Sequence, residues 1–263
     1  MHCWTVYLVS LALTVASSWG KENTQIFRLG ETLEPSETPM GIYTLDPKIQ
    51  SVLKNYFTNS FGGMESWDQL NSLIIRGKLK LPQGNTFEFT NYRKKPDLNK
   101  TVVSLPRENS ITKSFDGKEA WQHHTFETDE PVQMPLANAI DFVRDSIFGS
   151  HLLYPQLPGK EISYLGEQRI GNHDCYQLGI TLPNKQYMTM SIDKETGLQV
   201  QQEQISSIDG RLHRYIQSDY RKVAGTNIPF KVKVYSDDKL LNETMLASVE
   251  ANRGVMPWVF QRH

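Results

Sequence analysis

The stretch SLIIRGKLKLPQGNTFEFTNYR, Ser72 to Arg93, decides the fold class of this 263-residue chain. In its first half, apolar side chains alternate with basic ones as far as Leu81, and a period of two is typical of a strand with one face toward water. A Gln-Gly-Asn turn follows, and Phe87 and Phe89 then share a face in the second half. Two such runs joined by a short turn predict an antiparallel hairpin.

The same alternation continues on the C-terminal side of this hairpin, in short runs spaced roughly as in an antiparallel meander. It is found at Lys100–Leu105, Ser110–Phe115 and Glu119–Phe126, and again in a series from Glu161 to Glu250 that is divided by turn signals. We count roughly eleven or twelve strands, too many for a flat open sheet. The sequence therefore predicts a mainly β fold built on one large, strongly curved antiparallel sheet.

Two amphipathic helices are expected beside these strands. Asp46-Pro47 gives an N-cap with proline at the first helical position, and apolar residues recur at helical spacing until Gly62-Gly63 ends the pattern. The second helix, Met134 to Phe148, is inserted between strands and carries Leu136, Ile140, Val143 and Ile147 on one face.

The first twenty residues run apolar and then reach small residues, as a secretory signal peptide does. We expect residues 1–20 to be removed on export, residues 21–45 to form a flexible N-terminal arm, and residues 46–263 to form a single domain. An uncleaved membrane anchor is the alternative for the first segment, because its start lacks a lysine or arginine.

Composition and motifs disfavour several classes of function. Lys plus Arg (28) nearly balances Asp plus Glu (29), so no global field would attract nucleic acid. Phosphate-loop and dinucleotide motifs are absent, so we expect no cofactor. His123 and His124 are adjacent, and would point to opposite faces of a strand rather than to one metal ion. There is no Gly-x-Ser-x-Gly elbow, so we expect a non-enzyme, although a catalytic triad can be assembled across a fold, which leaves a secreted hydrolase as an alternative.

The segment YRKKPDLNKTVVSLPRENSITKSFDGKEAW, Tyr92 to Trp121, resembles the early strands of the outer-membrane lipoprotein-sorting proteins, the LolA/LolB-like carriers. In that family a basic residue and proline open a strand, and an Asp-Gly turn leads to a strand that bears tryptophan. Lys95-Pro96, Asp116-Gly117 and Trp121 occupy those places. The later segments SIDKETGLQV, DYRKVAGTNIPFKVKVY and VEANRGVMPWVF are similar to the C-terminal half of the same broad group.

The resemblance implies an unclosed antiparallel β-barrel with amphipathic helices over its mouth, enclosing an apolar cavity for acyl chains of lipoproteins or other lipids. It also implies a periplasmic location and partners in the inner- and outer-membrane sorting machinery. In the carriers the basic residue before the proline is an arginine associated with holding a lid closed. Here it is Lys95, which lacks the planar fork of donors.

Alternation of apolar residues along the strands suggests which side chains line such a cavity, and the second helix suggests a lid. The expected lining residues are Ile75, Leu79, Phe87, Phe89, Trp121, Met188, Met190, Phe230, Val232 and Val234. The expected lid residues are Leu136, Ile140, Val143 and Ile147, with Lys95 at the latch position. Ordinary core packing would use the same residue types. The sequence therefore supports two hypotheses: a carrier or chaperone for lipids or lipoproteins, and a structural or interaction protein of the cell envelope whose core is filled.

Overall fold

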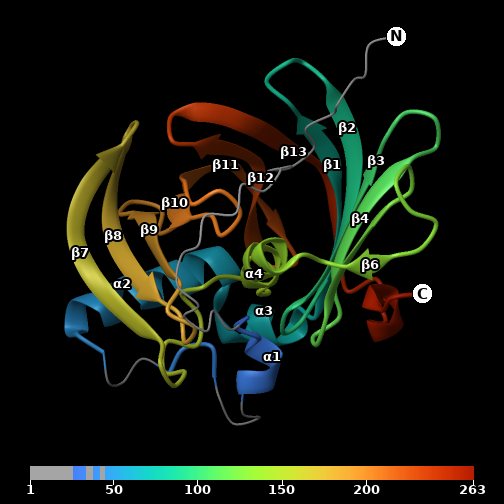
Figure 1. The fold of residues 1–263 in the computed structure, drawn as a ribbon. Coiled ribbons are helices and arrows are strands. Elements are labelled where there is room, and N and C mark those ends of the chain that lie inside the picture. The colour runs from blue at the N-terminus through green and yellow to red at the C-terminus, as the bar shows by residue number, and fades with distance from the viewer. Residues whose placement is uncertain (1–25, 34–37, 42–44) are drawn as a thin grey trace.

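One antiparallel sheet of thirteen strands forms most of the structure, a computed structural model that describes residues 26–33, 38–41 and 45–263 (Figure 1). The predicted signal peptide lies outside the described residues. The strands are β1 Ser72–Lys80, β2 Thr86–Lys94, β3 Leu98–Ser104, β4 Ser110–Phe115, β5 Ala120–His124, β6 Val132–Gln133, β7 Glu161–Ile170, β8 His173–Thr181, β9 Tyr187–Asp193, β10 Gln199–Ile205, β11 Leu212–Val223, β12 Thr226–Ser236 and β13 Lys239–Ala251. The helices are α1 Leu29–Thr32, α2 Pro47–Phe61, α3 Gly63–Gln69, α4 Leu136–Arg144 and the 3₁₀ helix η1 Pro257–Phe260.

The strands follow the order β6-β5-β4-β3-β2-β1-β13-β12-β11-β10-β9-β8-β7. Strands β1 to β6 form one meander and β7 to β13 form a second. The two meanders join where β1 pairs with β13, with Leu73 opposite Ala251 and Lys80 opposite Glu243. Strands β6 and β7 are the two edges and do not pair with each other. The sheet is therefore an unclosed barrel, which confirms the predicted fold class.

The chain between the two edge strands, residues 134–160, carries α4 inside the curve of the sheet (Figure 1). Helix α4 begins after Pro135 and ends at Arg144, so it is shorter than the predicted helix from Met134 to Phe148. The carbonyl oxygens of Asp145 and Ile147 accept hydrogen bonds from the Arg93 side chain instead of continuing the helical pattern. A tertiary contact thus ends the helix earlier than the spacing of apolar residues indicates.

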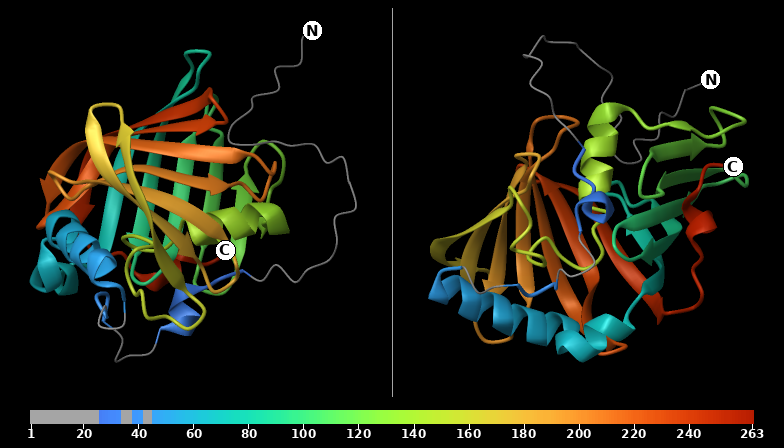
Figure 2. Two further views of the ribbon diagram at one scale, coloured as in Figure 1. Left: turned by 90° about the vertical axis from the view of Figure 1, so that its left-hand side faces the viewer. Right: turned by 90° about the horizontal axis from the view of Figure 1, so that it is seen from below.

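Helices α2 and α3 lie along one end of the curved sheet (Figure 2). The Asp46 side chain accepts a hydrogen bond from the Lys48 backbone N–H at 2.8 Å, and Pro47 occupies the first turn, as predicted. Gly62 ends α2 in the left-handed region at φ 70°. In the described ranges, no helix is long and apolar enough to cross a membrane.

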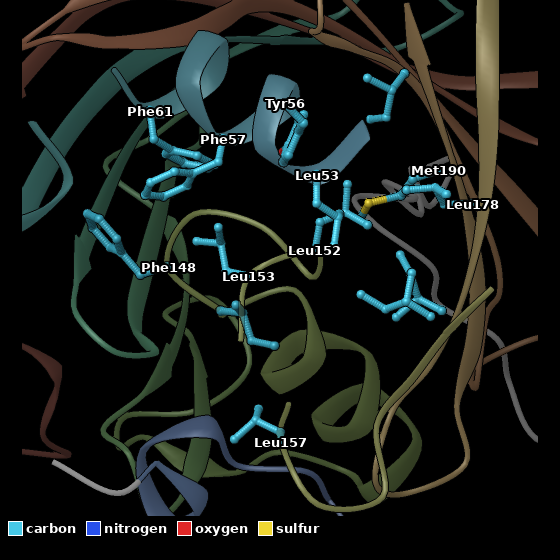
Figure 3. Packing of buried hydrophobic residues seen from close by; sticks show 14 of the residues in the cluster. Leu53, Tyr56, Phe57, Phe61, Phe148, Leu152, Leu153, Leu157, Leu178 and Met190 are labelled. Atoms are coloured by element: carbon cyan, nitrogen blue, oxygen red, sulfur yellow. The ribbon is translucent and has the colours of Figure 1, made fainter. Parts of the chain in front are cut away.

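The main core lies between α2, α3, strands β7 to β9 and the segment that follows α4 (Figure 3). Trp67 is edge-on to Phe61, with ring centroids 5.1 Å apart, and tilted against Phe148 at 6.0 Å. Leu178 and Ile180 of β8 are fully buried in the same cluster. This packing closes the α2 end of the barrel with side chains of the protein itself.

Part of the predicted arm packs against this core. Phe27 and Leu29 are buried in it. The Gly30 backbone N–H donates to Asp97 Oδ2 at 2.8 Å, and burial raises the pKa of Asp97 to about 6. Asp97 Oδ1 has no hydrogen-bond partner among the described residues. A single buried carboxyl therefore links α1 to the turn between β2 and β3.

Replacement of Leu178 by alanine is expected to lower the free energy of unfolding by roughly 2 to 5 kcal/mol, because it leaves a cavity in the main core. Leu165, 46% exposed on β7, provides the matched control, since Leu165→Ala removes the same atoms from the surface. Urea denaturation of both variants measures the difference. Equal losses would contradict the core described above.

Asp97 should make stability depend on pH. Its folded pKa of about 6 lies above the ordinary aspartate value of 3.8, so the folded state holds this proton more tightly and its stability falls as pH rises from about 4 to 6. The loss from this group is roughly 3 kcal/mol between those pH values. Asp97→Asn keeps an acceptor for Gly30 and cannot ionise, so its unfolding free energy, measured from pH 4 to 7, should lack this decline. If the difference in unfolding free energy between the wild type and Asp97→Asn does not change with pH, Asp97 is not the source of the pH dependence.

Candidate functional site

The concave side of the sheet holds two large hollows with a smaller recess between them. The helical-end hollow, of about 600 Å³, lies beside the C-terminal ends of α2 and α3 and is bordered by β1–β3 and β10–β13. The hairpin-end hollow, of about 670 Å³, lies beside α4 among the β1–β2, β10–β11 and β12–β13 turns. The middle recess is about 240 Å³. Asp145 borders all three and Asn242 borders both large hollows, so the spaces adjoin.

The helical-end hollow combines apolar walls with amide side chains. The apolar and aromatic side chains that line it include Phe61, Leu70, Leu73, Ile75, Leu79, Phe89, Phe148, Ile228, Val232 and Leu246. Asn91, Asn99, Gln199 and Gln217 lie among them. Drug-sized ligand pockets are usually several hundred cubic ångströms, mostly apolar, with a few placed polar groups. This hollow has that character.

Several predicted lining residues border these spaces. Ile75, Leu79, Phe89 and Val232 line the helical-end hollow. Met190 borders the middle recess, and Val234 borders the hairpin-end hollow.

The other predicted lining residues are placed in packed regions. Met188 lies in the main core, and Phe87 packs against a small cluster formed by Leu79, Leu81, Val103 and Ile111. Trp121 donates its indole N–H to the Phe260 carbonyl at 2.8 Å, so the C-terminal segment covers it. Phe230 lies under the Arg221 guanidinium, 4.4 Å from its ring centroid. The alternation of apolar residues cannot distinguish these packed residues from residues that border a hollow. The segments that cover them come from distant parts of the chain.

The predicted lid residues have different surroundings. Val143 is buried against Phe115 and Ala120 of the neighbouring strands, and Ile140 is also buried. Ile147 follows α4 and joins the main core. Leu136, at the start of α4, is 61% exposed.

Lys95, predicted at the latch position, lies over α3 instead of α4. Its ammonium is 3.9 Å from the centroid of the Trp67 ring and donates to the Trp67 carbonyl. Burial lowers the pKa of Lys95 to about 8. The side chain that contacts the end of α4 is that of Arg93, which lies on β2, two residues before Lys95. Arg93 Nη2 donates to the carbonyl oxygens of Asp145 at 2.9 Å and Ile147 at 2.8 Å.

A second set of polar contacts holds the other side of α4. Asp141 accepts from Arg144 Nη1 at 3.0 Å and from Ser206 Oγ at 2.9 Å, and both its oxygens accept from the Ser207 backbone N–H. Arg144 Nε donates to Asp145 at 2.9 Å. Helix α4 is thus connected to β2 on one side and to the β10–β11 turn on the other. The sequence shows these residues as the polar face of a helix, but the structure buries Asp141 and Arg144.

Charges around α4 perturb each other. Burial lowers the pKa of Arg93 to about 10, an effect that Asp145 opposes. Burial also acts to lower the pKa of Arg144, but the carboxylates of Asp145 and Asp141 outweigh it and raise this pKa. In the middle recess, burial lowers the pKa of His151 to about 3, so its imidazole is neutral at pH 7. A guanidinium, a neutral imidazole and several amides therefore face one polar recess.

Sequence reasoning missed Arg93 and Lys113, although a signal for both was present. Arg93 follows Phe87 and Phe89 at a period of two on β2, and Lys113 lies between Ile111 and Phe115 on β4. A charged side chain at an apolar position of an alternating strand faces the interior. Arg93 also begins a run of three adjacent basic residues, and such a run in a protein without net positive charge indicates a solvated turn.

No model of a known protein family matches the chain, and a search of curated proteins finds no match. Solved structures of other proteins share its fold, and three of them are compared below. An outer membrane lipoprotein-sorting protein domain from Vibrio parahaemolyticus has a TM-score of 0.56 at 12% identity, covering 80% of this chain and 95% of that one. A LolA superfamily protein from Nitrosomonas europaea has a TM-score of 0.52 at 12% identity, covering 81% and 97%.

The third, a DUF1329 family protein from Desulfovibrio piger, has a TM-score of 0.56 at 13% identity and covers 82% and 98%. At these identities the likeness concerns the fold. It confirms, at the level of architecture, the resemblance to lipoprotein-sorting proteins that the sequence indicates.

Arg93→Met is expected to loosen the end of α4, because it removes two hydrogen bonds from a charged donor, each worth about 1.5 to 3 kcal/mol. Hydrogen exchange measured by mass spectrometry should become at least tenfold faster in residues 136–148 than in the wild type. Arg76→Met, which removes an exposed guanidinium paired with Glu250, is the control and should leave this segment unchanged. Unchanged exchange in Arg93→Met would show that the guanidinium does not hold the helix.

Proposed function

We propose that this protein is a non-catalytic carrier or chaperone that binds the acyl chains of lipids or lipoproteins in the helical-end hollow. The observation that carries the proposal is a space of about 600 Å³ with apolar walls, left between the sheet and α2, and bordered by the segment that follows α4 and accepts a hydrogen bond from Arg93. A filled core would leave no such space. The fold of lipoprotein-sorting proteins supports the same function.

The energetics of the hollow suit an acyl chain. Each buried methylene contributes about 0.8 kcal/mol, so a chain of some sixteen carbons gains roughly 10 kcal/mol before the costs of ordering are subtracted. Ile75, Leu79, Phe89 and Val232 supply contacts from both meanders. No catalytic group is needed for this function.

Entry of a ligand requires a part of the wall that moves, and α4 is the part proposed here. The helix belongs to the segment that connects edge strands β6 and β7, and these two strands do not pair with each other. Arg93 and the Asp141 contacts hold it, and both can exchange with water or with polar ligand groups. In this proposal Arg93 acts as the latch that the family resemblance assigns to the position of Lys95.

The place of action proposed here is the bacterial envelope. A signal peptide predicted at residues 1–20 would export the chain to the periplasm. The outer membrane lipoprotein-sorting domain with the same fold supports lipoproteins as cargo and the sorting machinery as a partner.

Filling the hollow tests this function. Val232→Trp places a large ring in the helical-end hollow and should weaken binding of a fluorescent fatty acid at least tenfold, because ring and chain cannot occupy the same space. Lys233→Trp adds the same ring at the next position of β12, on the other face, and should bind like the wild type. Circular dichroism establishes that both variants are folded.

The result that contradicts the proposal is a folded wild-type protein that binds no fatty acid and carries no lipid when purified. If wild type and Val232→Trp bind equally well, the ligand occupies another place. Thr244→Phe, at the position opposite Val232 on β13, provides a second filling variant.

A further inference from the structure

Lys113 is a cation without a partner inside the barrel. It lies on β4 between Ile111 and Phe115, which are both buried, and borders the hairpin-end hollow. Within the described part of the chain its ammonium neither forms an ion pair nor donates a hydrogen bond. Burial lowers the pKa of Lys113. The side chain is half-buried, and an anion beside a partly desolvated ammonium would offset part of the cost of its burial.

The acidic residues of the same hollow are already engaged elsewhere. Asp141 is shared between Arg144 and the Ser206–Ser207 turn, and Asp145 accepts from Arg144. Asp209 Oδ1 accepts from the Arg211 backbone N–H at 3.1 Å, and its Oδ2 lies 3.4 Å from His213 Nε2. These contacts satisfy the carboxylates on the side of α4 and the β10–β11 turn, and leave the β4 wall positive.

A second polar group in this hollow also lacks a partner. Ser236 Oγ is buried, borders the hairpin-end hollow, and has no hydrogen-bond partner among the described residues. A hydroxyl can donate to an anionic oxygen, so Ser236 and Lys113 offer complementary donors to the same kind of group.

The two large hollows adjoin near Lys113. Thr101 is directly opposite Lys113 on β3 and lines the helical-end hollow, and Asn242 borders both spaces. A molecule with an apolar chain in the helical-end hollow can therefore extend a head group past Asn242 toward the ammonium.

We propose that the ligand is an amphipathic anion, whose carboxylate or phosphate head binds Lys113 in the hairpin-end hollow while its acyl chain occupies the helical-end hollow. This inference rests on the proposed function and adds the chemical class of the ligand. It also explains why a lysine occupies the apolar face of β4, where an aliphatic residue would pack at lower cost.

Displacement of a fluorescent fatty acid from the purified full-length protein tests the head-group site. Palmitate and hexadecyl phosphate should displace it at concentrations at least tenfold lower than hexadecanol, which has the same chain without the charge. Lys113→Met retains the length of the side chain and should bring the three ligands to similar affinities. Lys113→Arg should keep the preference for anions. Lys118→Met changes an exposed lysine in the adjacent β4–β5 turn and should behave like the wild type.

Three results overturn the inference while the proposed function stands. The first is equal displacement by palmitate and hexadecanol in the wild type, and the second is a preference for anions that persists in Lys113→Met. Displacement by inorganic phosphate as effective as that by hexadecyl phosphate would also overturn it, because the acyl chain would then contribute nothing. If no ligand with a sixteen-carbon chain binds, the proposed function fails, and the inference fails with it.

Discussion

The pairing of β1 with β13 is the constraint on which the hollow depends. It is the contact that joins the two meanders, and it connects residues 72–80 with residues 243–251. A bulge lies between Arg76 and Gly77, where a Cβ atom on Gly77 would be 2.4 Å from the Met245 carbonyl oxygen. Glycine permits this close approach, and bulges increase local twist and bend. The curve that faces Leu79 and Phe89 toward Val232 therefore starts at this seam.

The sheet remains open between β6 and β7, so helices complete the barrel. Apolar packing holds the helices at the α2 end, whereas polar contacts help to hold α4. The α2 end is closed by interdigitated aromatic and aliphatic side chains such as Trp67 and Phe148, which would leave a cavity if they separated. Helix α4 has an apolar face too, but its C-terminal half is also held by the polar contacts of Arg93 and Asp141, which water can replace. Under the proposed function, α4 is therefore the part that opens, and the α2 end is the part that stays closed.

Much of the architecture was predictable from local patterns, and the site was predictable only in part. A period of two marked the strands, and Asp46-Pro47 and Gly62 marked α2, because these signals act within a few residues. The β1–β13 seam has no local signal. The cover over Trp121 also depends on a distant segment, since its partner is the Phe260 carbonyl. Arg93 and Lys113 were visible as charges on apolar faces, but adjacency in sequence suggested a solvated run for Arg93.

The mixture of polar and apolar groups in the hollow bears on how firmly a ligand is held. Asn91 and Gln217 line the same space as Leu79 and Val232, so water can hydrogen-bond to the walls when no ligand is present. Displacing that water offsets part of the gain from burying an acyl chain, and affinity then depends on whether polar ligand groups recover the lost hydrogen bonds. A chain alone would bind weakly and leave readily, whereas a chain with a matching head would be retained. Under the proposed function, a hollow of this composition selects for amphipathic molecules over simple hydrocarbons, and it releases them once α4 moves and the head group is hydrated again.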